Sequence, residues 1–179
     1  MEQAIAIGER QDMTRLTHWI LPLVGSAALA GGVFLPAQDT QLDAKQLKEM
    51  ITNLGYVPKD LAEGKFEFVV SREGLDIPLA AEVSASKNYV WLTAYFGQIP
   101  TDFGDRPLKM LRANFEVQPS QFYITKSDKL MMGIALDNRN IHPAILRRNV
   151  DKVAKDVAST QALWTFDGFD QSGPQTQAR

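Results

Sequence analysis

The stretch that decides the fold, residues 76–96, reads DIPLAAEVSASKNYVWLTAYF. Apolar residues alternate with polar or small residues on both sides of the turn formers at 86–88. Alternation with a period of two is typical of strands, and turn formers between two such runs favour a reversal of the chain. The stretch therefore predicts two antiparallel strands, about 76–83 and 89–96, each with one face in the core.

The second of these strands is aromatic on the face that does not enter the core. Leu92 and Phe96 belong to the core side, whereas Tyr89, Trp91 and Tyr95 lie on the other side. Aromatic side chains are favoured at protein interfaces because they bring a large contact area at a small entropic cost. Either a helix of the same chain covers these three residues, or they are a partner-binding surface, which is the hypothesis that we follow.

A helix and a further strand precede this hairpin. Leu47, Ile51 and Leu54 are spaced i, i+4 and i+7, which is the apolar stripe of an amphipathic helix over residues 43–54. Phe66, Phe68 and Val70 then alternate with polar residues and predict a strand. The N-terminal half of the domain is therefore a helix followed by three strands.

A short helix, a hairpin and a long helix follow. Pro107 suits the first turn of a helix over 107–115, and strands at about 121–125 and 130–136 are joined by a tight turn. From Pro143 a helix runs to Trp164, with an apolar stripe at Leu146, Val150, Val153, Val157, Gln161 and Trp164. The order α-β-β-β-α-β-β-α predicts an α+β fold, an antiparallel sheet of about five strands with helices packed on one face.

Composition limits the classes of function. A chain of 179 residues has room for one ordinary domain, and 45% hydrophobic residues are enough to build a core. The net charge of −2, without clustered Lys or Arg, argues against nucleic acid as a partner. The absence of cysteine excludes disulfides, thiolate nucleophiles and thiolate metal sites.

The first 37 residues have the layout of an export signal. No Asp, Glu, Lys or Arg occurs from Leu16 to Ala37, a basic residue precedes this run, and small residues end it. We expect a signal peptide over residues 1–37, with Met13 as a possible true start and cleavage before Gln38. The expected location is the periplasm or the outside of a bacterial cell. An uncleaved signal would instead be a membrane anchor, and a buried hairpin or core helix is the further alternative.

The rest of the chain divides into a domain at 38–165 and a tail at 166–179. The tail is rich in Gly, Gln, Ser and Pro, a composition typical of disorder.

The order of elements resembles the type III secretion chaperone-like fold, including the YbjN-like family. The features that carry the resemblance are the helix end Leu54-Gly55-Tyr56, the hairpin from Val83 to Leu92 with its Val90-Trp91-Leu92 segment, and the long helix after Pro143. The resemblance implies a binding protein, often a dimer, that holds extended segments of partner proteins without chemistry. The secretion chaperones themselves work in the cytosol, and an export signal would depart from that pattern.

Few residues of the chain are candidates for catalysis or metal binding. His142 is the only histidine after the export signal, and a lone histidine lacks the further ligands or orienting groups that metal binding and catalysis require. Ser84 and Lys87 match S-x-x-K, but at a strand end rather than on a helix. Glu67 and Glu82 on neighbouring strands are the remaining candidate pair. We therefore expect no enzyme, no cofactor and no metal site.

The hypothesis for function is an exported, chaperone-like domain that binds a protein segment or peptide and forms a homodimer. We expect Leu108, Leu111 and Phe115 to face the sheet, with Met110 and Asn114 together on a neighbouring side. These five residues are the predicted dimer interface, because the two longer helices suffice to cover the sheet. The alternatives are a small envelope hydrolase using carboxylates and serines, and a structural envelope module.

Overall fold

The computed structural model of this chain describes residues 41–165 and the pair 175–176. The predicted signal peptide, and the predicted tail apart from that pair, lie outside the described residues. Within the described ranges, no helix is both long enough and apolar enough to cross a membrane.

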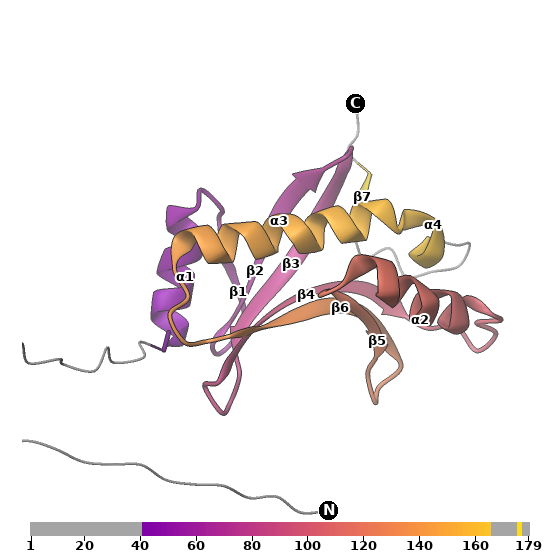
Figure 1. Ribbon diagram of the computed structural model, residues 1–179, viewed down its shortest axis with the longest axis horizontal. Coiled ribbons are helices and arrows are strands. Elements are labelled where there is room, and N and C mark those ends of the chain that lie inside the picture. The colour runs from indigo at the N-terminus through magenta and orange to yellow at the C-terminus, as the bar shows by residue number, and fades with distance from the viewer. Residues whose placement is uncertain (1–40, 166–174, 177–179) are drawn as a thin grey trace, which may run out of the picture. The chain divides into compact units, whose positions relative to one another are not determined.

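The described strands form one antiparallel sheet, in the order β1-β2-β3-β4-β6-β5, with β7 paired to β3 beside this path (Figure 1). All five predicted strands are present, and the sheet path has a sixth, β1, whose four residues are all exposed and give no alternation. The bounds are Lys59–Ala62 for β1, Lys65–Arg72 for β2, Leu75–Val83 for β3, Tyr89–Gln98 for β4, Gln121–Ile124 for β5, Lys129–Asp137 for β6 and Gln175–Thr176 for β7.

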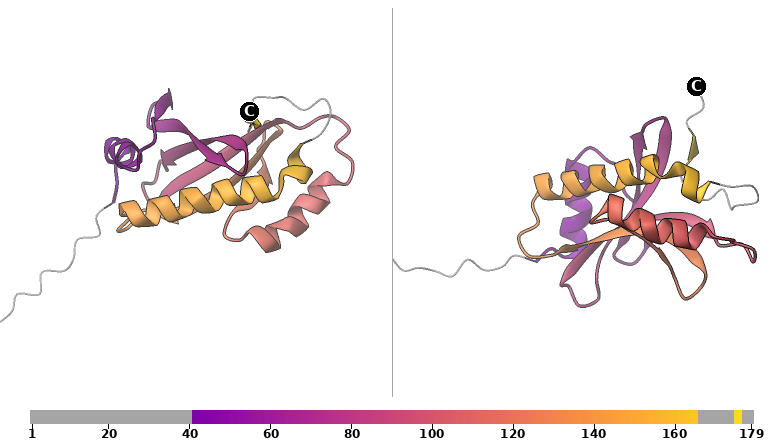
Figure 2. Two further views of the ribbon diagram at one scale, coloured as in Figure 1. Left: turned by 90° about the horizontal axis from the view of Figure 1, so that it is seen from above. Right: turned by 45° about the vertical axis from the view of Figure 1, so that its right-hand side comes forward.

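Helices pack on one face of the sheet, as predicted. Helix α3 lies across the strands, with α2 beside it near β5 (Figures 1 and 2). The long closing helix is divided at Thr160 into α3 and α4, so Gln161 is exposed rather than part of the buried stripe. The bounds are Ala44–Asn53 for α1, Arg106–Val117 for α2, Pro143–Ser159 for α3 and Gln161–Trp164 for α4.

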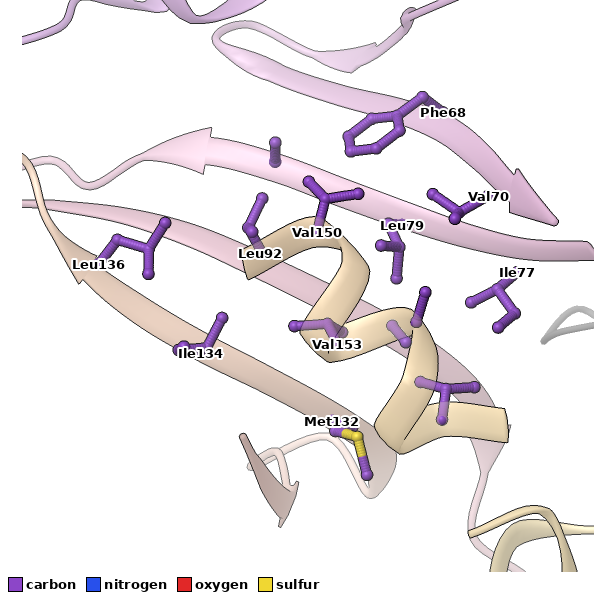
Figure 3. Packing of buried hydrophobic residues seen from close by; sticks show 14 of the residues in the cluster. Phe68, Val70, Ile77, Leu79, Leu92, Met132, Ile134, Leu136, Val150 and Val153 are labelled. Carbon is purple, nitrogen blue, oxygen red and sulfur yellow. The ribbon is translucent and has the colours of Figure 1, made fainter. Parts of the chain in front are cut away.

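The core lies between the inner face of the sheet and α3. Figure 3 shows Leu79 and Leu92 of the central strands pointing toward Val150 and Val153 of the helix, and all four are 0% exposed. Burial of one such side chain stabilises the fold by about 1.5–3 kcal/mol. The apolar stripe predicted for the closing helix is thus confirmed at every position except Gln161.

Helix α2 turns a different face to the sheet from the one predicted. Met110 is 2% exposed, and the side chain of Asn114 accepts from the backbone N–H of Phe122 at 2.7 Å and donates to its carbonyl at 3.2 Å. The residues predicted to face the sheet are exposed: Leu108 by 50%, Leu111 by 66% and Phe115 by 76%.

Two apolar stripes on α2 explain this error. Met110, Ala113 and Val117 have the same i, i+3, i+7 spacing as the exposed stripe that begins at Leu108. Periodicity alone cannot choose between them. The amide of Asn114 determines which stripe faces the sheet. It satisfies both backbone groups of Phe122 on β5 and so turns the Met110 side inward.

Candidate functional site

The outer face of the sheet is formed by the alternate residues that point away from the helices. Strand register places Thr93 of β4 opposite Gly133 of β6, and Trp91 of β4 opposite Ala135 of β6. Trp91 also lies opposite Glu82 of β3. The four described helices pack on the other face, so the aromatic strand face is not covered by any of them.

A groove of about 630 Å³ is hollowed into this outer face. Its shape follows from residue size, because the central positions carry the small residues Thr93, Gly133 and Ala135 while larger side chains stand around them. The groove is lined by Lys65, Glu82, Trp91, Thr93, Pro119, Gln121, Tyr123, Thr125, Met131, Gly133, Ile134 and Ala135. The size is that of known ligand pockets, about 300–1,000 Å³.

Gly133 keeps the floor of the groove low. A Cβ atom at this position would lie 2.9 Å from the carbonyl oxygen of Leu92, 2.9 Å from Cγ2 of Thr93 and 3.5 Å from Cε1 of Tyr123. The first contact is with backbone, which cannot move aside easily. Glycine therefore allows Thr93 and Tyr123 to approach the β6 backbone, and any larger residue would disturb both the floor and one wall.

Polar groups lie at the rim of the groove. The Lys65 ammonium and the Glu82 carboxylate form an ion pair at 3.4 Å across β2 and β3. Burial raises the pKa of the Tyr123 hydroxyl above its usual 10, and the charge of Glu82 raises this pKa further. Tyr123 thus keeps its proton at neutral pH and can donate a hydrogen bond toward the groove.

The three predicted partner-binding residues do not share one pocket. Trp91 lines the groove. Tyr89 is 46% exposed and lines a separate hollow of about 270 Å³ beside Asp137 and Arg139. Tyr95 is half-buried, and the Lys129 ammonium lies 5.8 Å from its ring centroid.

Strands β5 and β6 supply lining residues that sequence reasoning missed. Tyr123, Met131 and Gly133 belong to strands that were predicted, but no face was assigned to these residues. The missing information was the pairing of β6 with β4, which joins residues about 40 positions apart and is not encoded in any local pattern. Gly133, an isolated glycine within a strand pattern, was the available signal of close approach.

The candidate catalytic residues His142 and Ser84 lie in different parts of the fold. His142 is exposed at the start of α3, and its side chain makes no capping bond. Ser84 lies in the β3–β4 turn, where its hydroxyl bonds to Ser86 and to the backbone N–H of Tyr89. Among residues 41–165 and 175–176, no group of three or more His, Asp or Glu side chains is placed to hold a metal ion.

Glu67 and Glu82 are not directly opposite one another in the sheet. Glu67 lies opposite Ala80 in the register of β2 and β3, and Glu82 lies opposite Lys65. The cross-strand partner of Glu82 is therefore the lysine with which it forms its ion pair.

A second apolar area, the α2 surface, consists of Leu108, Leu111 and Phe115 with Tyr123 and Ile124 of β5. All five side chains are exposed. A hollow of about 220 Å³ separates α2 from β5, and its lining includes Leu111, Tyr123 and Ile124. Contiguous exposed apolar residues of this kind are typical of sites of protein–protein contact.

Comparison with solved structures gives the fold. A chain of the heterodimeric ExoU–SpcU complex from the type III secretion system of Pseudomonas aeruginosa matches with a TM-score of 0.50 and 14% identity, over 66% of this chain and 97% of that chain. The HopA1–SchA chaperone–effector complex gives 0.48 and 11%, over 65% and 90%. The domain has the type III secretion chaperone-like fold. At these identities the likeness shows the fold alone.

The sequence comparisons do not assign the chain to a family. No family model matches the chain, and no curated protein matches it. The YbjN-like resemblance stays a prediction.

Proposed function

We propose that this domain is a non-enzymatic, chaperone-like module that binds a segment of a partner protein in the groove on the outer face of its sheet. The observation that carries the proposal is the groove itself, a hollow that none of the described helices covers, with a floor of small residues and walls that include Trp91, Tyr123 and Met131. The fold supports it, because the structure matched with a TM-score of 0.50 comes from a complex of two different proteins of a type III secretion system.

The residues of the groove are better suited to binding a peptide than to catalysing a reaction. Trp91 and Tyr123 offer large, rigid contact areas, which are the usual anchors of protein recognition. The Lys65–Glu82 pair and Thr125 supply polar contacts at the rim. A bound segment would place an apolar side chain over Thr93 and Gly133 and its polar groups toward that rim.

A displayed library of random-sequence peptides, selected on the full chain, tests the proposal. The blocking variant is Ala135→Trp, because Ala135 is exposed in the groove and a tryptophan there fills it without entering the core. The control is Ala144→Trp, an exposed alanine on α3 at the other face. We expect selected peptides to bind the parent and the control but not the blocking variant. Peptides that bind all three proteins equally would refute the proposal that the groove is the peptide-binding site.

We also propose that the domain self-associates through the α2 surface. Leu108, Leu111 and Phe115 of the predicted interface belong to this surface. Met110 and Asn114 do not, since they are engaged within the protomer. Sedimentation at micromolar concentration should give a dimer for the parent and for the exposed-site control Ala144→Asp, and a monomer for Phe115→Asp. A parent that sediments as a monomer would reject the proposal.

Export and the YbjN-like relationship are the remaining parts of the proposal. The support for export is the uncharged run from Leu16 to Ala37, and the support for the relationship is the order of elements. Mass spectrometry of the native protein tests cleavage of the signal: a terminus at Gln38 is expected, and an intact Met1 or Met13 terminus would reject cleavage.

A further inference from the structure

Thr93 places one hydroxyl in the floor of the groove. The residue lies on β4 between Leu92 and Ala94, which are both 0% exposed, and is itself only 8% exposed. It lines the groove, so the part that stays exposed faces the groove. Its hydroxyl makes no hydrogen bond to any residue within 41–165 or 175–176. Thr93 is therefore a polar side chain, more than nine-tenths buried, without a partner in the described part of the chain.

The pairing of the strands explains why this hydroxyl lacks a partner. Thr93 lies opposite Ala80 of β3 and opposite Gly133 of β6, and neither residue has a side chain that can form a hydrogen bond. The methyl group of Thr93 faces Gly133, because a Cβ atom placed there would lie 2.9 Å from Cγ2 of Thr93. The hydroxyl takes another position on Cβ. A group that enters the groove can therefore supply the hydrogen bond that the neighbouring strands do not.

Filling the groove changes the surroundings of this hydroxyl. Water can reach it in the free protein, since the Thr93 hydroxyl is not among the fully enclosed, unpartnered side-chain atoms of the described residues. A side chain that lies over Thr93 displaces this water, and a pure hydrocarbon would leave the hydroxyl without a hydrogen bond. Such an unpaired polar group weakens binding, whereas a paired one does not. Thr93 therefore distinguishes segments that carry a hydrogen-bonding group at this point from segments that do not.

The number of hydrogen bonds on offer narrows the class of side chain. One hydroxyl oxygen matches the single N–H of tryptophan or the single O–H of tyrosine. A carboxamide has two N–H donors and an acceptor and would stay partly unpaired. A charged group would lose its hydration without a counter-ion, because Lys65 and Glu82 at the rim pair with each other. Serine and threonine match the hydroxyl but bury little apolar area.

The walls of the groove favour the same aromatic class. Trp91, Tyr123 and Met131 supply two rings and a thioether. Aromatic rings pack favourably against other rings and against thioether sulfur. The small residues Gly133 and Ala135 between these walls leave the depth that a ring requires.

We propose that the groove selects a segment anchored by tryptophan or tyrosine, and that the Thr93 hydroxyl accepts a hydrogen bond from the N–H or O–H of this anchor. The inference rests on the proposed function and specifies the apolar side chain that lies over Thr93 and Gly133. The ring of the anchor contacts the walls, and its donor gives the selectivity over phenylalanine and leucine.

Two substitutions in the full chain separate the hydroxyl from the shape of the floor. Thr93→Val keeps the branched shape and removes the hydroxyl, whereas Thr93→Ser keeps the hydroxyl and removes the methyl group. Random-sequence peptides are selected by display on the parent, on Thr93→Val and on Thr93→Ser. We expect tryptophan or tyrosine to be enriched at one position in the peptides from the parent and from Thr93→Ser. Phenylalanine or leucine should take that position in the peptides from Thr93→Val.

A double-mutant cycle measures the hydrogen bond itself. The donor is removed from a selected peptide by Tyr→Phe, or by exchanging the indole of tryptophan for benzothiophene. This change should weaken binding to the parent and to Thr93→Ser about 5-fold, as expected for one hydrogen bond, and should leave binding to Thr93→Val unchanged. Binding of the donor-free peptide also shows that Thr93→Val is folded.

The outcomes separate this inference from the proposed function. Equal losses on all three proteins, or no loss on the parent, would overturn the role of Thr93. Selected peptides without an aromatic donor would also overturn it, and the groove proposal would stand if Ala135→Trp still blocks their binding. Peptides that bind Ala135→Trp normally, or a selection that yields no peptide, would count against both.

Discussion

The amide of Asn138 is expected to be among the most sensitive single side chains of the domain. Asn138 is 0% exposed at the end of β6. Its side-chain oxygen accepts from the N–H of Leu42 at 3.1 Å, and its amide nitrogen donates to the carbonyls of Leu42 at 2.9 Å and Lys87 at 2.8 Å. One side chain thus ties the segment before α1 and the β3–β4 turn to the sheet.

Asn138→Ala removes three hydrogen bonds, two of them buried and one partly buried, without adding bulk. At about 0.5–1.5 kcal/mol each, the loss is about 2–4 kcal/mol, a large part of the roughly 5–15 kcal/mol that stabilises a domain. Urea denaturation measures it as a lower midpoint with an unchanged slope. Asn53→Ala, at the exposed end of α1, is the matched control and should change stability by no more than about 0.5 kcal/mol. Equal midpoints for the two variants would show that the Asn138 bonds do not stabilise the domain.

Three further substitutions test the core, a buried ion pair and the groove. Val153→Asp puts an unpaired charge at a position with 0% exposure and should leave little folded protein; a parent-like melting curve would contradict the packing of α3. Lys152→Met removes the partner of the buried carboxylate of Asp156 and should cost about 2 kcal/mol, because Lys152 is partly solvated. Adding Asp156→Asn should recover part of that loss, and no recovery would mean that the pair is not the cause. Glu82→Gln should lower the pKa of Tyr123, although burial still keeps it above 10. An alkaline absorbance titration, with Tyr123→Phe as the reference, measures the pKa of Tyr123. An unchanged pKa in Glu82→Gln would show that the charge of Glu82 does not act on the Tyr123 hydroxyl. The stability linked to the neutral hydroxyl is present below pH about 10 and is lost as the pH rises through the raised pKa.

Local patterns predicted most of the fold, because most of its strands have one buried and one exposed face. Phe66, Phe68 and Val70 alternate with exposed or half-buried residues, and that contrast is visible in the sequence. Strand β1 has no such contrast, since all four of its residues are exposed. Its place is set by pairing with β2 and by the ion pair between Lys48 of α1 and Asp60 at 2.7 Å, which local periodicity does not report.

The site was harder to predict because it depends on which elements become neighbours. Trp91 was recognisable as an aromatic residue on a face outside the core. The opposite wall at Tyr123 belongs to β5, which reaches the groove only because β6 lies between it and β4. The face of α2 was undetermined for a related reason: two apolar stripes have equal spacing, and the choice depends on the contact between Asn114 and Phe122 across the turn that follows the helix.

Tyr123 connects the two surfaces that we assign to binding and self-association. Its side chain lines the groove and also the hollow between α2 and β5, so it borders both the segment site and the α2 surface. A second copy packed against Leu111 and Ile124 would contact one side of Tyr123 while a bound segment contacts the other. Ordering that ring costs side-chain entropy. The first partner to bind orders the ring, so the second partner binds without this loss of entropy. Segment binding and dimerisation should therefore be thermodynamically linked, with the same coupling factor in both directions.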